Sequence, residues 1–216
     1  MLAAPARAHA ETIDFTGLGH AAVVNVRGLL NARVWAGELN WAWVGSVPEG
    51  FDPVFYTYCV DITNVLTDPQ SVTIRSSAEL RPATHGGGKA AWLLNTFAPG
   101  IRASGTNAQG AALQVAIWEA LYDTSPNLAG GSFYLASGMT GSAIWTLAAS
   151  YLSQLYYAPG TYHIGTAAWL DSPRGQDQIT LVPEPSILLL LGGGLLLFGR
   201  RHPRGSSGVP APQASP

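Results

Sequence analysis

Apolar and polar residues alternate in short runs in the first third of the chain and again over residues 160–182, which is typical of β-strands. Val, Trp, Tyr and Phe are frequent in these runs, and Gly, Pro and Asn separate them. Residues 71–78 show the pattern in its simplest form, with Val72, Ile74 and Ser76 on one face. The predicted strands cover residues 20–30, 33–44, 54–62, 71–78, 160–169 and 176–182.

The middle of the chain changes to a helical period. Helices are predicted over residues 89–97, 107–122 and 140–157, and the last carries Ile144, Leu147, Tyr151 and Leu155 on one stripe. Thr106 and Gln109 form a capping box at the start of the second helix. Strands, then helices, then strands predict an α+β domain. We expect a mostly antiparallel sheet or sandwich with an inserted set of about three helices.

Composition and charge narrow the class of protein. Nearly half of the 216 residues are apolar and only 11% are charged, which fits an exported β-rich domain and argues against disorder. Residues 11–182 hold 12 acidic and seven basic side chains. Without a basic patch, nucleic-acid binding is excluded as a function.

The two ends of the chain differ from its middle. Ala8-His9-Ala10 has the form of a signal-peptidase site, so we expect residues 1–10 to be a signal-peptide remnant whose apolar core lies upstream. One domain of residues 11–182 follows. Residues 183–201 form a sorting and anchoring segment, and residues 202–216 are expected to be a disordered tail.

The sorting segment combines Pro183-Glu184-Pro185, an apolar run over residues 187–199, and Arg200-Arg201. As a short apolar helix, residues 186–199 would extend only about 21 Å, against a hydrocarbon core of roughly 30 Å. The arginines would stay in the cytoplasm. The segment resembles the PEP-CTERM sorting signal, except for its longer tail. The resemblance implies an exosortase-type processing enzyme as partner, transient insertion in the inner membrane, and delivery to the surface or matrix of a Gram-negative bacterium.

Two residues of the domain call for a chemical explanation. Cys59 is the only cysteine, so it cannot form an internal disulfide in an oxidising compartment. Gln114 shares a helical stripe with Ile117, Trp118 and Leu121, which directs its amide into the core. Burying an amide without partners costs about 1–3 kcal/mol. The Gln114 amide is therefore either hydrogen-bonded or part of a covalent bond.

Three segments together resemble the thioester domain of bacterial surface adhesins. They are Tyr58-Cys59-Val60-Asp61, Ala91-Trp92-Leu93-Leu94-Asn95 and Leu113-Gln114-Val115-Ala116-Ile117-Trp118. The resemblance implies a thioester between Cys59 and Gln114 that attaches the protein covalently to amine or hydroxyl groups on a surface or matrix partner. Tyr56, Tyr58, Trp92 and Trp118 would shield the bond from water.

Other interpretations of the same residues remain open. The first is a noncovalent structural matrix or biofilm protein of the same fold, with a buried Cys59 and a hydrogen-bonded Gln114. Cys59 paired with His85 or His163 would suggest a thiol hydrolase, but a cysteine within a strand lacks the usual activation, so we expect no enzyme.

Metal and cofactor sites are not expected, because the histidines are dispersed. Asp61 is interpreted as a hydrogen-bonding group at a strand end, with a role in orienting Cys59 as the alternative. Trp35, Trp41 and Trp43 share one strand face, which indicates core packing more than carbohydrate stacking.

Overall fold

The computed structural model describes residues 10–80, 87–157 and 167–182, which belong to one compact unit. Seven strands form one antiparallel sheet. They are β1 (Ala10–Gly28), β2 (Ala32–Trp43), β3 (Val54–Cys59), β4 (Gln70–Ser76), β5 (Phe133–Leu135), β6 (Ala167–Asp171) and β7 (Gln178–Leu181). The helices are α1 (Gly87–Ser104), α2 (Asn107–Tyr122) and α3 (Ala143–Tyr157), with short 3₁₀ turns at Ser77–Glu79 and Ser137–Met139. The predicted α+β class with inserted helices is confirmed.

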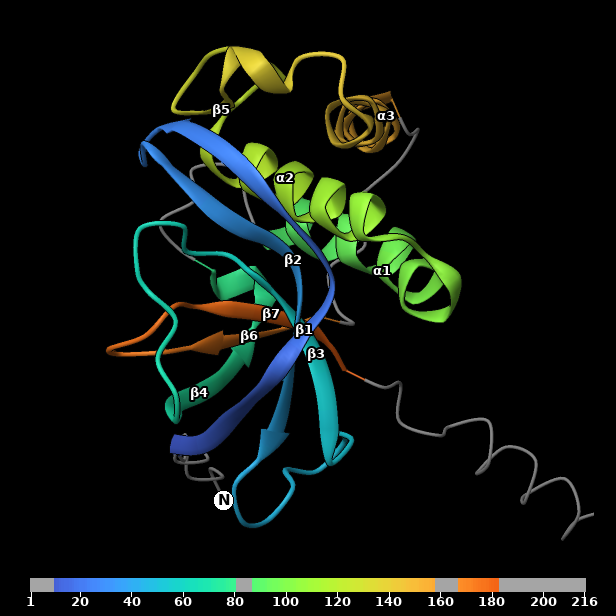
Figure 1. The fold of residues 1–216 in the computed structure, drawn as a ribbon. Coiled ribbons are helices and arrows are strands. Elements are labelled where there is room, and N and C mark those ends of the chain that lie inside the picture. Colours follow the sequence, from blue (N-terminus) through green and yellow to red (C-terminus); the bar gives the residue numbers. More distant parts are fainter. Residues whose placement is uncertain (1–9, 81–86, 158–166, 183–216) are drawn as a thin grey trace, which may run out of the picture. The chain divides into compact units, whose positions relative to one another are not determined.

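Six of the strands close on themselves. The order β2-β3-β7-β6-β4-β1 is completed by the pairing of β1 with β2, so these strands form a ring, and β5 adds to the far end of β1. Figure 1 shows the ring below the helices. Its interior is filled by aromatic and branched side chains, namely Ile13, Leu39, Trp41, Trp43, Phe55, Val72 and Leu170.

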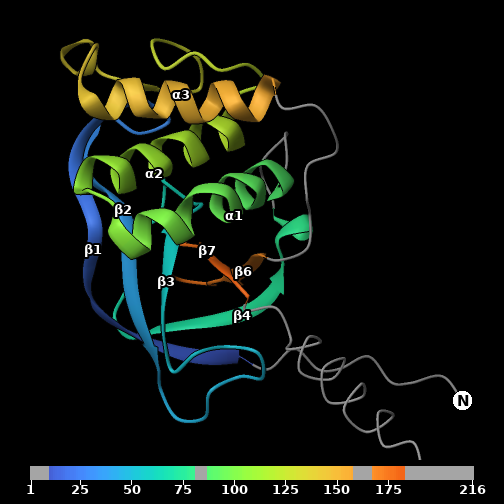
Figure 2. The same cartoon turned by 90° about the vertical axis from the view of Figure 1, so that its right-hand side faces the viewer.

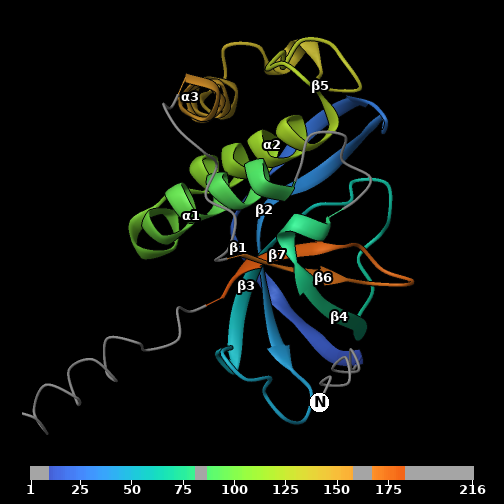
Figure 3. The same cartoon turned by 180° about the vertical axis from the view of Figure 1, so that it is seen from behind.

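Strands β1 and β2 are longer than the ring and continue beyond it as a two-stranded arm. β2 pairs with β3 only from Leu39–Thr57 to Ala42–Val54, whereas its pairing with β1 continues to Val26–Ala32. The arm supports α2, and α1 and α3 pack against α2 in turn (Figures 2 and 3). A second and larger core fills the space between the arm, the end of β3 and the three helices.

Several element boundaries differ from the prediction. β1 begins at Ala10 rather than at residue 20, and α1 continues through Pro99 to Ser104. Ala98 and Ile101 are buried on either side of this proline, so packing offsets the lost helical hydrogen bond. β3 ends at Cys59. The three-residue β5 was not predicted, and the beginning of the strand predicted over residues 160–169 lies outside the described residues.

Candidate functional site around Cys59 and Gln114

The structure brings Cys59 and Gln114 together through hydrogen bonds. The backbone N–H of Cys59 donates a hydrogen bond to Gln114 Oε1 at 2.8 Å, and Gln114 Nε2 donates to the carbonyl oxygen of Cys59 at 2.7 Å. Both residues are buried, with 3% of Cys59 and 1% of Gln114 exposed. The carboxamide therefore lies along the main chain of the residue that carries the thiol.

This arrangement depends on the separation of β2 from β3. The β2–β3 register would place Gly37 opposite Cys59, but the pairing stops at Leu39–Thr57. On its other side Cys59 pairs with Gln178 of β7. The Gln114 amide thus takes the hydrogen bonds that a neighbouring strand would otherwise make with Cys59. A strand end that would be left unpaired in the core is satisfied by one side chain from a helix.

Close packing of α2 on the arm allows the Gln114 side chain to reach the main chain of Cys59. A Cβ on Gly110 would come within 1.8 Å of the His20 carbonyl oxygen, and one on Gly37, where φ is +133°, within 2.3 Å of the same atom. Glycine at both positions removes the clash. The predicted capping box fixes the start of the helix, with mutual hydrogen bonds between Thr106 and Gln109. Gln114 follows one turn after Gly110.

Trp118 and Tyr122 continue the stripe of Gln114 toward the end of β3. The Tyr122 hydroxyl donates to the Val60 carbonyl oxygen at 3.0 Å and accepts from the Ile62 N–H at 3.3 Å. Helix α2 therefore holds the main chain of β3 and of the following loop at two places. Tyr122 was missed in the sequence. Its spacing of eight from Gln114, two helical turns, was the available signal.

The Cys59 thiol is buried and protonated. Its Sγ donates to the Asp61 carbonyl oxygen at 3.2 Å. Burial raises the pKa of the Cys59 thiol well above its usual range. The Trp118 indole N–H lies toward the sulfur and lowers this pKa in part, although its geometry falls short of a hydrogen bond.

Asp61 interacts with Cys59 through its main chain, while its carboxylate organises the loop. Oδ1 accepts from the Thr63 N–H at 3.0 Å and the Thr63 hydroxyl at 2.7 Å, and Oδ2 accepts from Asn64. This local turn agrees with the interpretation of Asp61 as a hydrogen-bonding group at a strand end.

The four residues expected to shield a thioester lie in different surroundings. Tyr58 and Trp118 are buried, and Trp118 adjoins the thiol. Tyr56 is half-buried, with its ring 5.1 Å from the Arg102 guanidinium. The Trp92 ring contacts Phe97, which stacks on Tyr151 of α3, so Trp92 belongs to the α1–α3 contact.

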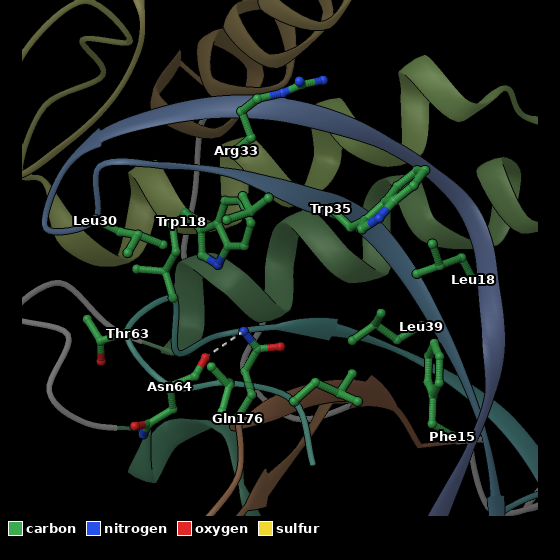
Figure 4. A pocket seen from close by; sticks show the side chains of 14 residues that line it. Phe15, Leu18, Leu30, Arg33, Trp35, Leu39, Thr63, Asn64, Trp118 and Gln176 are labelled. Carbon is green, nitrogen blue, oxygen red and sulfur yellow. Dashed lines mark hydrogen bonds between the residues drawn. The ribbon is translucent and has the colours of Figure 1, made fainter. Parts of the chain in front are cut away.

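A cavity of about 550 Å³ opens at the mouth of the ring, next to Trp118 (Figure 4). Trp118 forms part of its wall, and Trp35 lies at its edge, 59% exposed. The expectation that Trp35, Trp41 and Trp43 all pack in the core is therefore wrong for Trp35. Core packing is found for Trp41 and Trp43. Trp35 is on the same face of β2 but lies beyond the end of the closed ring, where no strand covers that face.

Most of the other predicted site residues lie outside the part of the chain that the structure describes. Within the described residues, no cluster of His, Cys, Asp and Glu is suited to hold a metal ion. His85, His163 and the sorting segment with Pro183, Glu184 and Pro185 lie outside the described residues. The same is true of the predicted apolar helix. Among the helices that the structure does describe, none combines the length and hydropathy needed to cross a bilayer.

Comparison with protein families finds one match. Residues 181–204 match the PEP-CTERM protein-sorting motif, the segment identified above from Pro183-Glu184-Pro185, the apolar run and Arg200-Arg201. No curated protein and no solved structure matches the chain. The protein therefore carries a signal for export and for sorting to the cell surface by an exosortase.

Proposed function

We propose that the exported domain holds an internal thioester between Cys59 and Gln114 and uses it to attach covalently to a nucleophile on a surface or matrix partner. The observation that carries the proposal is the pair of hydrogen bonds between the Gln114 carboxamide and the main chain of Cys59. They fix the electrophilic carbon beside the residue that bears the thiol. Groups that are held in a reacting geometry can gain roughly 7–11 kcal/mol of the barrier in this way.

Bond formation needs no added reagent. The Cys59 sulfur attacks the Gln114 side-chain carbonyl carbon, and the backbone N–H of Cys59 already donates to the oxygen on which negative charge develops. Because burial raises the pKa of the thiol, its proton must move to the departing nitrogen as the C–S bond forms. The C–N bond breaks, ammonia leaves, and the thioester remains.

When the bond is used, the Cys59 sulfur becomes the leaving group. A primary amine on the partner attacks the same carbon, the C–S bond breaks, and the Cys59 thiol is regenerated with the proton that the amine loses. Gln114 is then joined to the partner by an amide. The reaction occurs once per molecule. Since both residues are almost completely buried, hydrolysis in the absence of a partner is slow.

A second function is favoured by a specific observation. The two hydrogen bonds satisfy the Gln114 carboxamide and both main-chain groups of Cys59, which a purely structural clamp also requires. In that case the domain acts as a noncovalent structural component of the surface or matrix.

The intact mass of the purified chain separates the two functions. For the thioester we expect a mass lower than the sequence value by one ammonia. Methylamine should then add its full mass, with Cys59 becoming alkylatable. Cys59→Ala and Gln114→Glu are the matched controls and should show neither change. A mass equal to the sequence value, with no gain from methylamine, would refute the covalent function and leave the structural one.

A further inference from the structure

The cavity beside the Cys59–Gln114 pair has the form of a ligand site. Its volume of about 550 Å³ falls within the roughly 300–1,000 Å³ of small-molecule pockets, which are mostly apolar with a few placed polar groups. Figure 4 shows side chains from β1, β2, the loop after β3 and α2 around one hollow. Its apolar wall consists of Phe15, Leu18, Leu30, Val34, Trp35, Leu39, Ile62, Val65, Leu66 and Trp118.

The cavity adjoins the reactive pair through Trp118. This residue lines the cavity, and its indole N–H lies toward the Cys59 sulfur. Alternation along β3 places the Cys59 side chain on the same face as Phe55 and Thr57. Phe55 packs inside the ring, and Thr57 accepts from the Trp41 indole there. The thiol therefore points into the end of the ring that opens toward the cavity.

The polar groups of the cavity are almost all neutral. They come from Thr63, Asn64 and Gln176, and no carboxylate occurs among its lining residues. Arg33 is the one charged lining residue, and its guanidinium is directed away from the hollow (Figure 4). The Asp61 carboxylate, which adjoins the cavity through Thr63 and Asn64, already accepts hydrogen bonds from both residues. The apolar wall therefore accommodates an apolar group with an uncharged amine better than an ammonium ion. The uncharged amine is also the form that attacks a thioester.

A further feature points to an occupant. At the rim, apolar side chains are exposed to unusual extents: 59% for Trp35, 74% for Val65 and 39% for Leu18. Exposed apolar groups that continue into a hollow are typical of a binding surface.

From these observations we infer that the cavity is the recognition site for the acceptor. It binds an aromatic ring or aliphatic chain that carries the attacking primary amine, and it selects apolar amines over small polar ones. The acceptor role rests on the proposed thioester, whereas binding of the apolar group does not require the bond. On a partner protein the ligand would be a lysine side chain beside an aromatic or aliphatic residue.

The first arm of the test measures acceptor choice. The full chain is treated with 2-phenylethylamine or methylamine at equal concentration of the uncharged form, and the gain in mass is followed with time. We expect 2-phenylethylamine to react at least tenfold faster. Trp35→Ala should reduce this preference to below threefold. The control Val54→Ala removes a similarly exposed apolar side chain outside the cavity and should leave the preference intact.

The second arm measures binding without the bond. In Cys59→Ala, 2-phenylethanol should quench tryptophan fluorescence in a saturable manner, and Trp35→Ala in the same background should weaken this binding at least fivefold. Saturable binding by a chain whose mass shows no thioester supports the recognition site while refuting the covalent function. Equal rates for the two amines would refute the acceptor role, and the absence of saturable binding would overturn the site itself.

Discussion

Replacing Gln114 by Met tests whether its amide is the structural partner of β3. Methionine keeps the length and apolar volume of the side chain but removes both hydrogen bonds to Cys59. The backbone N–H and carbonyl of Cys59 would then be buried and unpaired, at a cost of about 1–3 kcal/mol each. We expect the free energy of unfolding to fall by about 2–6 kcal/mol, a large part of the roughly 5–15 kcal/mol of a typical domain.

The measurement is urea unfolding in a Cys59→Ala background, so that a thioester cannot contribute. With a slope of about 2 kcal/mol per M, the midpoint should fall by about 1–3 M. Gln154→Met makes the same substitution at an exposed position of α3 and should change the stability by less than about 0.5 kcal/mol. If Gln114→Met costs no more than this control, the amide does not hold the end of β3.

Three further outcomes follow from buried charge and from the sorting motif. Burial raises the pKa of Glu119 from 4.5 to about 7, so the folded state holds the proton more tightly than the unfolded state. The free energy of unfolding should therefore fall as pH rises from about 4.5 to 7. In denaturation curves across this range, Glu119→Gln should remove this dependence of stability on pH. Arg102→Met leaves the buried Glu38 carboxylate without its ion pair to the partly exposed guanidinium and should cost about 1–3 kcal/mol in urea unfolding, most of it recovered by adding Glu38→Gln. Glu184→Ala alters the matched sorting motif, and surface fractionation should show unprocessed chain retained in the membrane.

The pairing of Cys59 with Gln114 could be predicted because each residue was anomalous in its own local pattern. A lone cysteine in an exported chain and an amide on an apolar helical stripe both require partners, and the order of the surrounding motifs resembled a known pairing. The structure brings the two within hydrogen-bonding distance. What the sequence could not supply is the mode of contact, because the amide meets the main chain of Cys59, and backbone groups have no sequence signature.

The closed ring and its cavity were not predicted for a related reason. Alternation assigns a residue to a face, but it does not say where along a strand that face stops being covered. Trp35 and Trp41 share a face and are 59% and 0% exposed, because β2 loses its β3 partner beyond Leu39. The extent of pairing depends on the register between strands distant in sequence, and single-strand patterns contain no information on it.

The separation of β2 from β3 links all parts of the site. It leaves the end of β3 without a strand partner, so that Gln114 can occupy the vacant hydrogen-bonding edge of Cys59. It also leaves the mouth of the ring open, which creates the cavity beside Trp118. If β2 and β3 had stayed paired through Gly37, the same sheet would be more regular, and both the buried amide contact and the cavity would be lost. A local loss of sheet pairing, offset by packing of α2 on the arm, thus gives this end of the domain both features.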